Sequence, residues 1–174
     1  MPQIMYGFES TNEEILKNIN KKVSASKAQD VIQWTRAARI EVRGAFMLGN
    51  HGETTQSMMS TIEYSVRAGI QFAIYNITTP YPGTPLYAWA QEQGYLMHRD
   101  WNLYDLSHPV LNLPTVTPDE IAECYRKAYR AFYMRPSFLI ERLLAVRSWD
   151  YFLINLKAFL GIARTALPLG GNKK

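Results

Sequence analysis

The sequence predicts an α/β fold: the carboxyl-terminal half of a partial (β/α) TIM-like barrel, followed by a helical tail. In residues 1–94, short apolar runs alternate with segments of helical periodicity, an order that favours a parallel sheet with crossover helices. Two of these runs end in turns rich in glycine or proline, the layout by which α/β barrels present ligand-binding loops. The last third of the chain has helical periodicity.

The chain is predicted to begin with a strand at residues 3–8. Thr11 or Asn12 can cap the helix that follows, because a short polar side chain accepts hydrogen bonds from the free amides of a first turn. This helix is expected to end near residues 21–22, where two lysines suit the negative end of the helix dipole. Periodic alanine, valine and isoleucine positions predict a second helix at residues 26–38.

A strand at residues 40–48, a helix at residues 54–68 and a strand at residues 71–77 are predicted next. The helix has methionine, isoleucine and valine positions spaced for one buried face, and Gly69 fits the position after a helix end. The last strand is an almost continuous run of β-branched and aromatic residues, which predicts a strand covered on both faces.

Beyond Pro85 the pattern changes to a short helix at residues 86–93, an irregular aromatic segment and a helical tail. A long irregular segment inside a compact domain is either functional or packed across a face. The tail helices are predicted at residues 118–134, 136–147 and 149–167. The expected domain boundaries are 1–94 for the half barrel, 95–116 for the connecting segment, 117–168 for the helical extension and 169–174 for a disordered tail.

Composition limits the class of protein. The chain has 174 residues, of which 47% are hydrophobic, enough for one domain with a real core. A net charge of +4 without a basic stripe argues against a nucleic-acid partner. The one cysteine, Cys124, permits neither an internal disulfide nor a multi-thiolate metal site. The first residues lack the features of a secretory signal and no long apolar window occurs, so a cytoplasmic protein without a membrane span is expected.

The most informative segment is residues 44–54, GAFMLGNHGET. Gly44, Gly49 and Gly52 stand where an apolar strand ends and a helix begins, and glycine lets a ligand approach the backbone closely. By themselves, glycines after a strand more often form a tight turn than a nucleotide site. His51 has no second histidine at ligand spacing, so we interpret it as a loop residue rather than a metal ligand or a general base.

Two further strand ends carry polar residues. In residues 78–87, TTPYPGTPLY, prolines and a glycine rigidify the turn, so Thr79 and Tyr81 are held in place at little ordering cost on binding. At the end of the first strand, Glu9 and Ser10 can bind a vicinal diol, or they can simply start the next helix.

Together these strings resemble radical S-adenosylmethionine enzymes, in particular the group that carries a cobalamin-binding domain ahead of the radical core. GFES at residues 7–10 resembles the fourth-strand motif, FMLGNHGET at residues 46–54 the fifth, and PYPGTPL at residues 80–86 the ending of the sixth. Family members usually have proline where this chain has His51. The resemblance covers about residues 3–165 but only about a third of a complete enzyme.

The resemblance implies that an apolar side chain packs on adenine over a bed of glycines. It also implies that polar side chains bind the ribose hydroxyls or the methionyl end of the cofactor, and that the last loop lines the opposite side. The residues so assigned are Met47 or Leu48 for adenine, Gly44 and Gly49 beneath it, Glu53 as a brace of the loop, Glu9 and Ser10 for the ribose or methionyl end, and Thr79 and Tyr81 opposite.

In this family S-adenosylmethionine is reductively cleaved at a [4Fe-4S] cluster held by a Cys-x-x-x-Cys-x-x-Cys motif, which this sequence lacks. The resemblance therefore implies an enzyme fragment, from about the fourth barrel strand onward, that supplies cofactor and substrate contacts but neither catalytic residues nor metal ligands. Such a fragment is expected to be inactive without an amino-terminal half, and to expose a sheet edge at residues 3–8. The substrate, a small or lipid-like molecule, and the use of cobalamin stay open.

Two other interpretations stand beside this one. A non-radical half-barrel enzyme would need its own acid and base, for which Glu9, Glu53 and His51 are the candidates. A non-catalytic α/β module or membrane-adjacent scaffold would use the tail, where residues 151–167 form an apolar segment with two cations on one face. Such a helix can rest on an anionic membrane or pack on the barrel.

Overall fold

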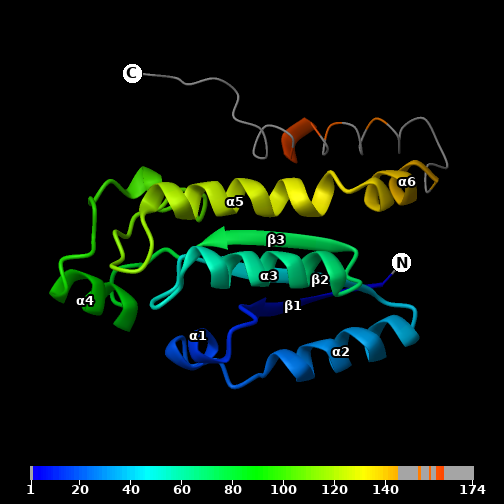
Figure 1. The fold of residues 1–174 in the computed structure, drawn as a ribbon, viewed down its shortest axis with the longest axis horizontal. Helices are drawn as coiled ribbons and strands as arrows, with labels where there is room; N and C mark the ends of the chain where they lie inside the picture. The colour runs from blue at the N-terminus through cyan, green and yellow to red at the C-terminus, as the bar shows by residue number, and fades with distance from the viewer. Residues whose placement is uncertain (1, 145–152, 154–156, 158–159, 163–174) are drawn as a thin grey trace. The chain divides into compact units, whose positions relative to one another are not determined.

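The computed structural model of the chain describes residues 2–144, 153, 157 and 160–162, and it confirms the α/β class. The elements, shown in Figure 1, are β1 (Gln3–Glu9), α1 (Glu13–Asn18), α2 (Ala25–Ala37), β2 (Glu41–Leu48), α3 (Thr55–Arg67), β3 (Phe72–Ile77), α4 (Pro85–Glu92), the 3-10 helix η1 (Trp101–Leu103), α5 (Pro118–Tyr133) and α6 (Pro136–Leu144). The helix predicted at residues 149–167 falls largely outside the described residues, and so does the membrane contact expected of it.

The chain divides into two compact units, residues 1–125 and 126–174, and each is described by itself. The domain boundaries expected from the sequence stay predictions. Among the described residues, no helix combines the length and apolar character that crossing a membrane requires.

The first unit is built on a three-stranded parallel sheet in the order β1-β2-β3. Met5 pairs with Arg43, and Arg43 pairs with Phe72, so the carboxyl ends of the strands meet at one edge. β1 pairs with β2 alone among the described strands, which confirms the predicted exposed edge. The sheet is open, and its closure into a barrel stays a proposal.

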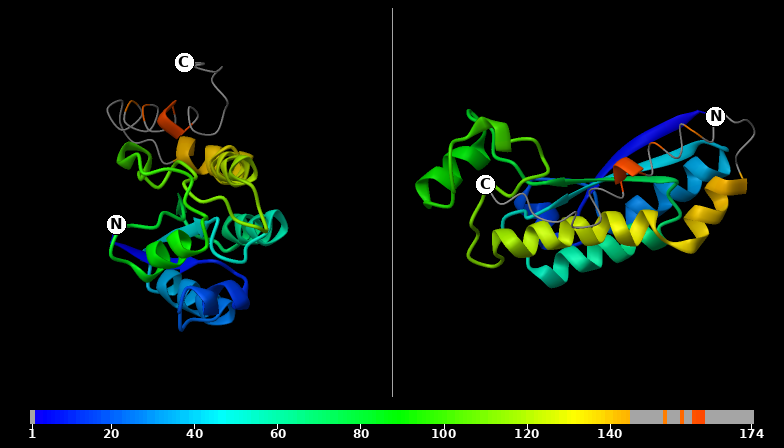
Figure 2. Two further views of the ribbon diagram at one scale, coloured as in Figure 1. Left: turned by 90° about the vertical axis from the view of Figure 1, so that its left-hand side faces the viewer. Right: turned by 90° about the horizontal axis from the view of Figure 1, so that it is seen from above.

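Helices α2 and α3 cover one face of this sheet (Figure 2). On that face the rings of Tyr6, Phe8, Phe46 and Tyr75 form a row, with neighbouring ring centroids 5.6–5.9 Å apart. The hydroxyls of Tyr6 and Thr35, 2.8 Å apart, join β1 to α2. A hydroxyl pair between Ser65 and Tyr75 joins α3 to β3 in the same way. This aromatic layer is the core of the unit.

The opposite face of the sheet is only half-covered. Burial alternates residue by residue along β2 and β3, and Met5 on β1 is 54% exposed. The prediction that residues 71–77 are covered on both faces is therefore confirmed for one face of β3 and only partly met on the other, where the side chains are half-buried. The apolar residues on this face are shielded in part by long polar side chains, since the guanidinium carbon of Arg43 lies 4.8 Å from the centre of the Phe72 ring.

The segment predicted to be irregular packs against the end of β3. The Ile77 amide donates a 2.7 Å hydrogen bond to the Leu106 carbonyl, and isolated bridges join Leu96 to Leu111 and Leu113 to Val116. The segment thus extends the core at one end of the sheet.

In the second unit, a break at Met134 and Arg135 separates α5 from α6, close to the boundary expected between helices at residues 118–134 and 136–147, because the residue before Pro136 is disfavoured in a helix. Phe132 and Tyr133 are buried beside Phe138, and the Arg135 guanidinium lies 4.0 Å from the Phe132 ring centre. Both Phe132 and Tyr133 are therefore core residues of this unit.

Candidate functional site

A cavity of about 740 Å³ lies at the carboxyl-terminal edge of the sheet. All three strand ends reach it: Glu9 ends β1, Met47 lies near the end of β2, and Thr78 follows β3. The other walls are the end of α1 (Asn18, Ile19, Asn20 and Lys21), the loop after β2 (Asn50 and His51) and the start of α4 (Thr84, Pro85, Leu86 and Trp89). The two turns that stand out in the sequence therefore meet at one cavity.

Direct contacts hold the ends of β2 and β3 together. The Thr78 amide donates to the Leu48 carbonyl at 2.8 Å, and the Thr78 hydroxyl donates to Asn50 Oδ1 at 2.9 Å. Asn50 and Thr78 are both buried. This confirms that the two strand tips lie side by side at the same end of the sheet, on which the interpretation of the sequence depends.

Glu53 holds the loop after β2 from inside. Its side chain has no exposed surface, and its Oε2 accepts hydrogen bonds from the Asn50 amide at 2.9 Å and from Asn50 Nδ2 at 3.3 Å. Burial raises the pKa of Glu53 to about 7, although hydrogen bonds from Asn50, Gly49 and Ser10 act to lower it. Glu53 does not line the cavity, so its position suits a brace rather than a ligand contact.

The end of β1 is a strained turn. The Ser10 amide donates to the Phe8 carbonyl at 2.8 Å, and Glu9 between them has a φ of 62°, which makes a γ-turn of the rare kind. A bulge interrupts the pairing with β2 between Gly7 and Glu9. A non-glycine residue in such a region costs about 1–3 kcal/mol, and bulges re-aim side chains near functional sites. Here the bulge and turn bring Glu9 to the cavity wall.

The Glu9 carboxylate pairs with a lysine from the end of α1. Lys21 Nζ lies 3.0 Å from Glu9 Oε1, and the side chains are 33% and 20% exposed. Lys21 has a fixed backbone position, because the Asn20 and Lys21 amides donate to the carbonyls of Lys17 and Leu16 in a helix-ending motif. Asn20 takes the left-handed conformation that the motif requires, with a φ of 56°.

Ser10 serves the start of α1. Its hydroxyl accepts a hydrogen bond from the Asn12 amide at 3.2 Å and lies 3.4 Å from the Thr61 hydroxyl, and the residue is 3% exposed. Asn12, one of the two predicted caps, accepts from the Glu14 and Ile15 amides. α1 ends at Asn18 rather than at the predicted residues 21–22, because the helix-ending motif stops it earlier than its lysines suggested.

Three of the other predicted residues belong to the packed interior. Leu48 is fully buried, so Met47 is the member of that pair that lines the cavity. Gly44 faces the core, where a Cβ would lie 2.8 Å from Ile70 Cδ1. Gly49 has a φ of 80°, and its Cβ would lie 3.0 Å from Ile121 Cδ1.

Thr79 and Tyr81, the two predicted site residues after β3, both form hydrogen bonds within the protein. Thr79 is 7% exposed and its hydroxyl donates to the Ile77 carbonyl. Tyr81 donates to the Tyr104 carbonyl at 2.8 Å. Neither lines the cavity. The ligand contacts assigned to these residues by resemblance stay predictions.

Sequence reasoning missed several residues of the cavity wall. Trp89 reaches it from α4, and its ring centroid lies 4.3 Å from that of His51. Thr84 caps α4 by accepting from the Tyr87 amide. The sequence did contain two local signals for these walls. Thr84 before Pro85 is typical of the start of a helix, and an asparagine such as Asn20 is typical of a helix end. Nothing in the sequence signalled the pairing of Lys21 with Glu9.

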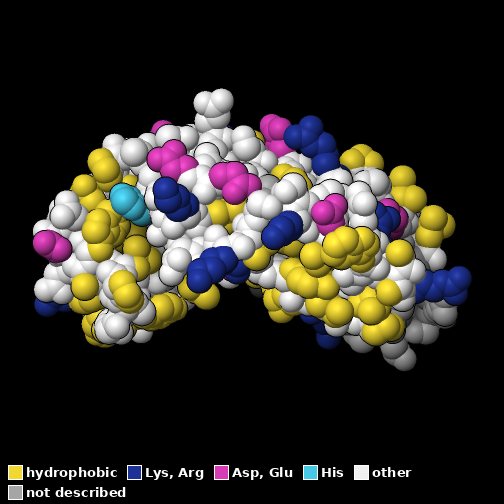
Figure 3. Space-filling model, turned by 90° about the horizontal axis from the view of Figure 1, so that it is seen from below, with side chains coloured by type: hydrophobic (Ala, Val, Ile, Leu, Met, Phe, Trp, Pro, Cys, Tyr) yellow, Lys and Arg dark blue, Asp and Glu magenta, His cyan; other side chains and the backbone are white. Residues whose placement is uncertain are grey.

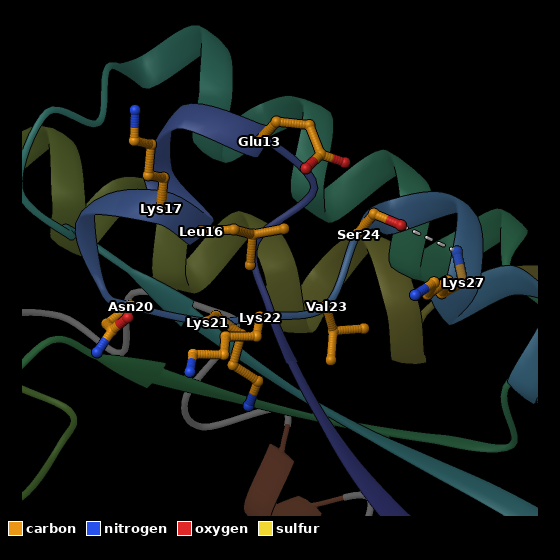
Figure 4. Close-up of a pocket in the computed structure, with 9 residues that line it drawn as sticks. All are labelled: Glu13, Leu16, Lys17, Asn20, Lys21, Lys22, Val23, Ser24 and Lys27. Carbon is orange, nitrogen blue, oxygen red and sulfur yellow. Dashed lines mark hydrogen bonds between the residues drawn. The ribbon is translucent and has the colours of Figure 1, made fainter.

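A second hollow, of about 540 Å³, lies between α1 and α2 (Figure 4). Glu13 is the acidic residue in its wall. Four of the lining residues are lysines: Lys17, Lys21, Lys22 and Lys27. Figure 3 shows Lys and Arg side chains in the middle of the face seen from below, the side on which α1 and α2 lie in Figure 1. Lys21 belongs to the walls of both hollows.

No family model matches the chain. An uncharacterised methyltransferase of Pyrococcus horikoshii is 32% identical to it over 138 residues, which cover 79% of this chain and 30% of that protein. The bacteriochlorophyllide d C-12(1)-methyltransferase of Chlorobaculum tepidum is 25% identical, over 84% of this chain and 32% of that protein. The anaerobic magnesium-protoporphyrin IX monomethyl ester cyclase of Cereibacter sphaeroides is 26% identical, over 96% and 28%.

The chain is a distant homologue of methyltransferases and cyclases. It spans about a third of the length of these relatives, so the homology concerns a part of each enzyme. This supports in part the resemblance on which the site residues were assigned, because the matches are to enzymes of the kind that it implies.

Proposed function

We propose that this chain is part of a radical S-adenosylmethionine enzyme of the cobalamin-associated class, and that it holds the adenosyl group of the cofactor and contacts the substrate. The observation that carries the proposal is the cavity in which three parallel strand ends meet the two loops quoted above. The distant homology to methyltransferases and cyclases supports it.

The cavity suits a nucleoside. Met47 offers a half-buried apolar side chain of the kind that packs on a purine ring, and Trp89 adds an aromatic surface. The carboxylate of Glu9 can accept hydrogen bonds from a vicinal diol, since only its Oε1 takes part in the contact with Lys21. Glu53 and Asn50 fix the loop between these groups, so little ordering is left for binding.

The residues present do not fit a [4Fe-4S] cluster. The sequence has one cysteine, and Cys124 is 1% exposed. Among the described residues, no group of three or more histidine, cysteine and acidic side chains could hold a metal ion. We therefore propose that the cluster ligands, and any cobalamin site, belong to residues outside this sequence, in the same polypeptide or in a separate one.

The chemistry would be that of the bound cofactor, which would supply a 5′-deoxyadenosyl radical on reductive cleavage, or a methyl group by transfer to a nucleophile. The residues of this chain bind and orient the adenosyl part. The resemblance implies a small or lipid-like substrate, and by analogy with the relatives named above this substrate would be methylated or cyclised. It would approach along the half-covered face of the sheet, which carries Met47 and Asn76 near the strand ends.

The test is a calorimetric titration of the full chain with 5′-deoxyadenosine, whose binding does not require a cluster. Met47→Ala removes the apolar contact with adenine and should weaken binding about tenfold. Met97→Ala is the matched control, because Met97 is 47% exposed and lies outside the cavity wall. Absence of saturable binding, or equal losses in the two variants, would overturn the proposal.

A further inference from the structure

We propose that Lys21 is a positioning residue for the Glu9 carboxylate, and that Gly7, Glu9 and Lys21 act as one group that presents this carboxylate to the vicinal diol of a ribonucleoside. The inference rests on the proposed function and deepens it: it names what makes the cavity select a ribose. Three features of the structure carry it.

The first feature is that the backbone places Glu9 at a conformational cost. The γ-turn and the bulge at the end of β1 hold Glu9 at a φ of 62°. Strained residues persist where surrounding contacts determine them, and they cluster at binding sites. The Glu9 side chain then contacts Lys21, with Oε1 at 3.0 Å from the ammonium nitrogen.

The second feature is that Lys21 approaches from a rigid element. The Lys21 amide donates to the Leu16 carbonyl at 2.7 Å and the Asn20 amide to the Lys17 carbonyl at 3.0 Å, so the residue is fixed to the end of α1. A surface ion pair between two mobile side chains contributes little. A pair whose partners are both fixed by their backbones loses less freedom when it forms, and it can hold a carboxylate in one orientation.

The third feature is that Gly7 leaves the room that this pair occupies. A Cβ on Gly7 would lie 2.6 Å from Glu9 Oε1 and 3.2 Å from Lys21 Nζ. Gly7 has no φ in the left-handed region, so the backbone itself does not require glycine there. The missing side chain instead allows the carboxylate and the ammonium group to lie against β1.

These features define how Lys21 acts on a ligand. Because Oε1 contacts Lys21, the carboxylate has a fixed orientation. Its other oxygen, Oε2, is then placed to accept a hydrogen bond from a ribose hydroxyl. Lys17, Lys22 and Lys27 line only the hollow between α1 and α2, so Lys21 alone of the four lysines there reaches the cavity. Lys22, the next residue, extends in the same direction as Lys21 in Figure 4 and offers a matched control.

The experiment compares the binding of adenosine and of 2′,3′-dideoxyadenosine to the full chain by calorimetry. Lys21→Met should weaken adenosine binding about five- to tenfold, because the orientation of the carboxylate is lost. Lys22→Met should change it less than about twofold, and Lys21→Arg should restore most of the affinity. Binding of the dideoxy ligand, which has no diol, should be the same in all four proteins.

Two further variants separate positioning from folding. Gly7→Ala should reproduce the loss seen with Lys21→Met, whereas Gly94→Ala should not, since a Cβ on Gly94 meets nothing within 4 Å. Adding Lys21→Met to Glu9→Gln should cause no further loss, because the two residues act through one carboxylate.

The inference is overturned if Lys21→Met and Lys22→Met behave alike, or if Lys21→Met weakens both ligands equally. In either case the binding of adenosine by the unmodified chain leaves the proposed function standing. If the unmodified chain binds neither nucleoside, both the inference and the proposed function fail.

Discussion

At the scale of single residues, Glu53 should make the stability of the protein depend on pH. Its ordinary pKa of 4.5 is raised by burial to about 7 in the folded state. Between these values the unfolded chain has released the proton while the folded chain still holds it, so the unfolding free energy falls as pH rises from about 4.5 to about 7. The unfolding free energy falls by about 3 kcal/mol in total. Above about pH 7, Glu53 causes no further change in stability.

The check is urea unfolding at several pH values across this window, with Glu53→Gln as the comparison. The amide keeps the shape of the protonated carboxyl and cannot ionise, so the variant should lose most of the pH dependence. An unchanged slope in the variant would show that another group causes it.

Gly49 should be sensitive to substitution for two reasons that can be separated. Gly49→Ala places a β-carbon on a left-handed residue, which costs about 1–2 kcal/mol, and brings it to 3.0 Å from Ile121, which adds about 1 kcal/mol. Gly94 has a similar φ of 71° with open space around it, so Gly94→Ala should show the backbone cost alone. Equal unfolding free energies for the two variants would contradict the packing of Gly49 on α5.

At this scale the sequence predicted residue positions better than their roles. A glycine at a strand end is easily found in a sequence, but the sequence does not show which face of the strand the glycine occupies. Gly44 faces the core, and its expected place beneath a ligand stays a prediction. Glu53 was expected to brace its loop, and its buried hydrogen bonds to Asn50 have that geometry.

At the scale of elements, the end of α1 should be governed by Asn20. Asn20→Gly should keep or raise the unfolding free energy, by up to about 1 kcal/mol, because glycine adopts a left-handed φ without strain. Asn20→Ala should lower it by about 1 kcal/mol, because alanine lacks that freedom. Thermal and urea unfolding of the two variants check this, and a destabilising Asn20→Gly would contradict the helix-ending motif.

The elements themselves could be predicted because strand and helix periods alternate clearly before residue 78. The end of α1 was misjudged, since lysines near a helix end are a weaker signal than an asparagine that can turn left-handed. The burial of β3 was predicted fully for one face and only partly for the other. An apolar strand can be shielded on one face by side chains such as Arg43, which the pattern of residues does not reveal.

At the scale of the whole molecule, the meeting of the two loops was predictable, because parallel strands place their carboxyl ends at one edge. The γ-turn at Glu9 and its pairing with Lys21 were not, since they depend on a bulge and on a helix end that come together only in the fold.

The chain by itself should neither hold a [4Fe-4S] cluster nor cleave S-adenosylmethionine. One buried cysteine cannot replace three clustered thiolates, so anaerobic incubation with iron and sulfide should leave no stable cluster on it. With a reductant and S-adenosylmethionine, no 5′-deoxyadenosine should form. A stable cluster on the isolated chain would show that the donor set has been misjudged.

The account depends most on the adenosyl group lying against Met47 at the strand ends. The most direct measurement is a nuclear magnetic resonance titration of the full chain, labelled at its 7 methionine methyl groups, with 5′-deoxyadenosine. The ring current of adenine should shift the Met47 methyl signal far more than those of Met58, which is buried, and Met97, which lies outside the cavity. A titration that leaves the Met47 signal in place, or that shifts another methionine instead, would contradict the assignment of the cavity.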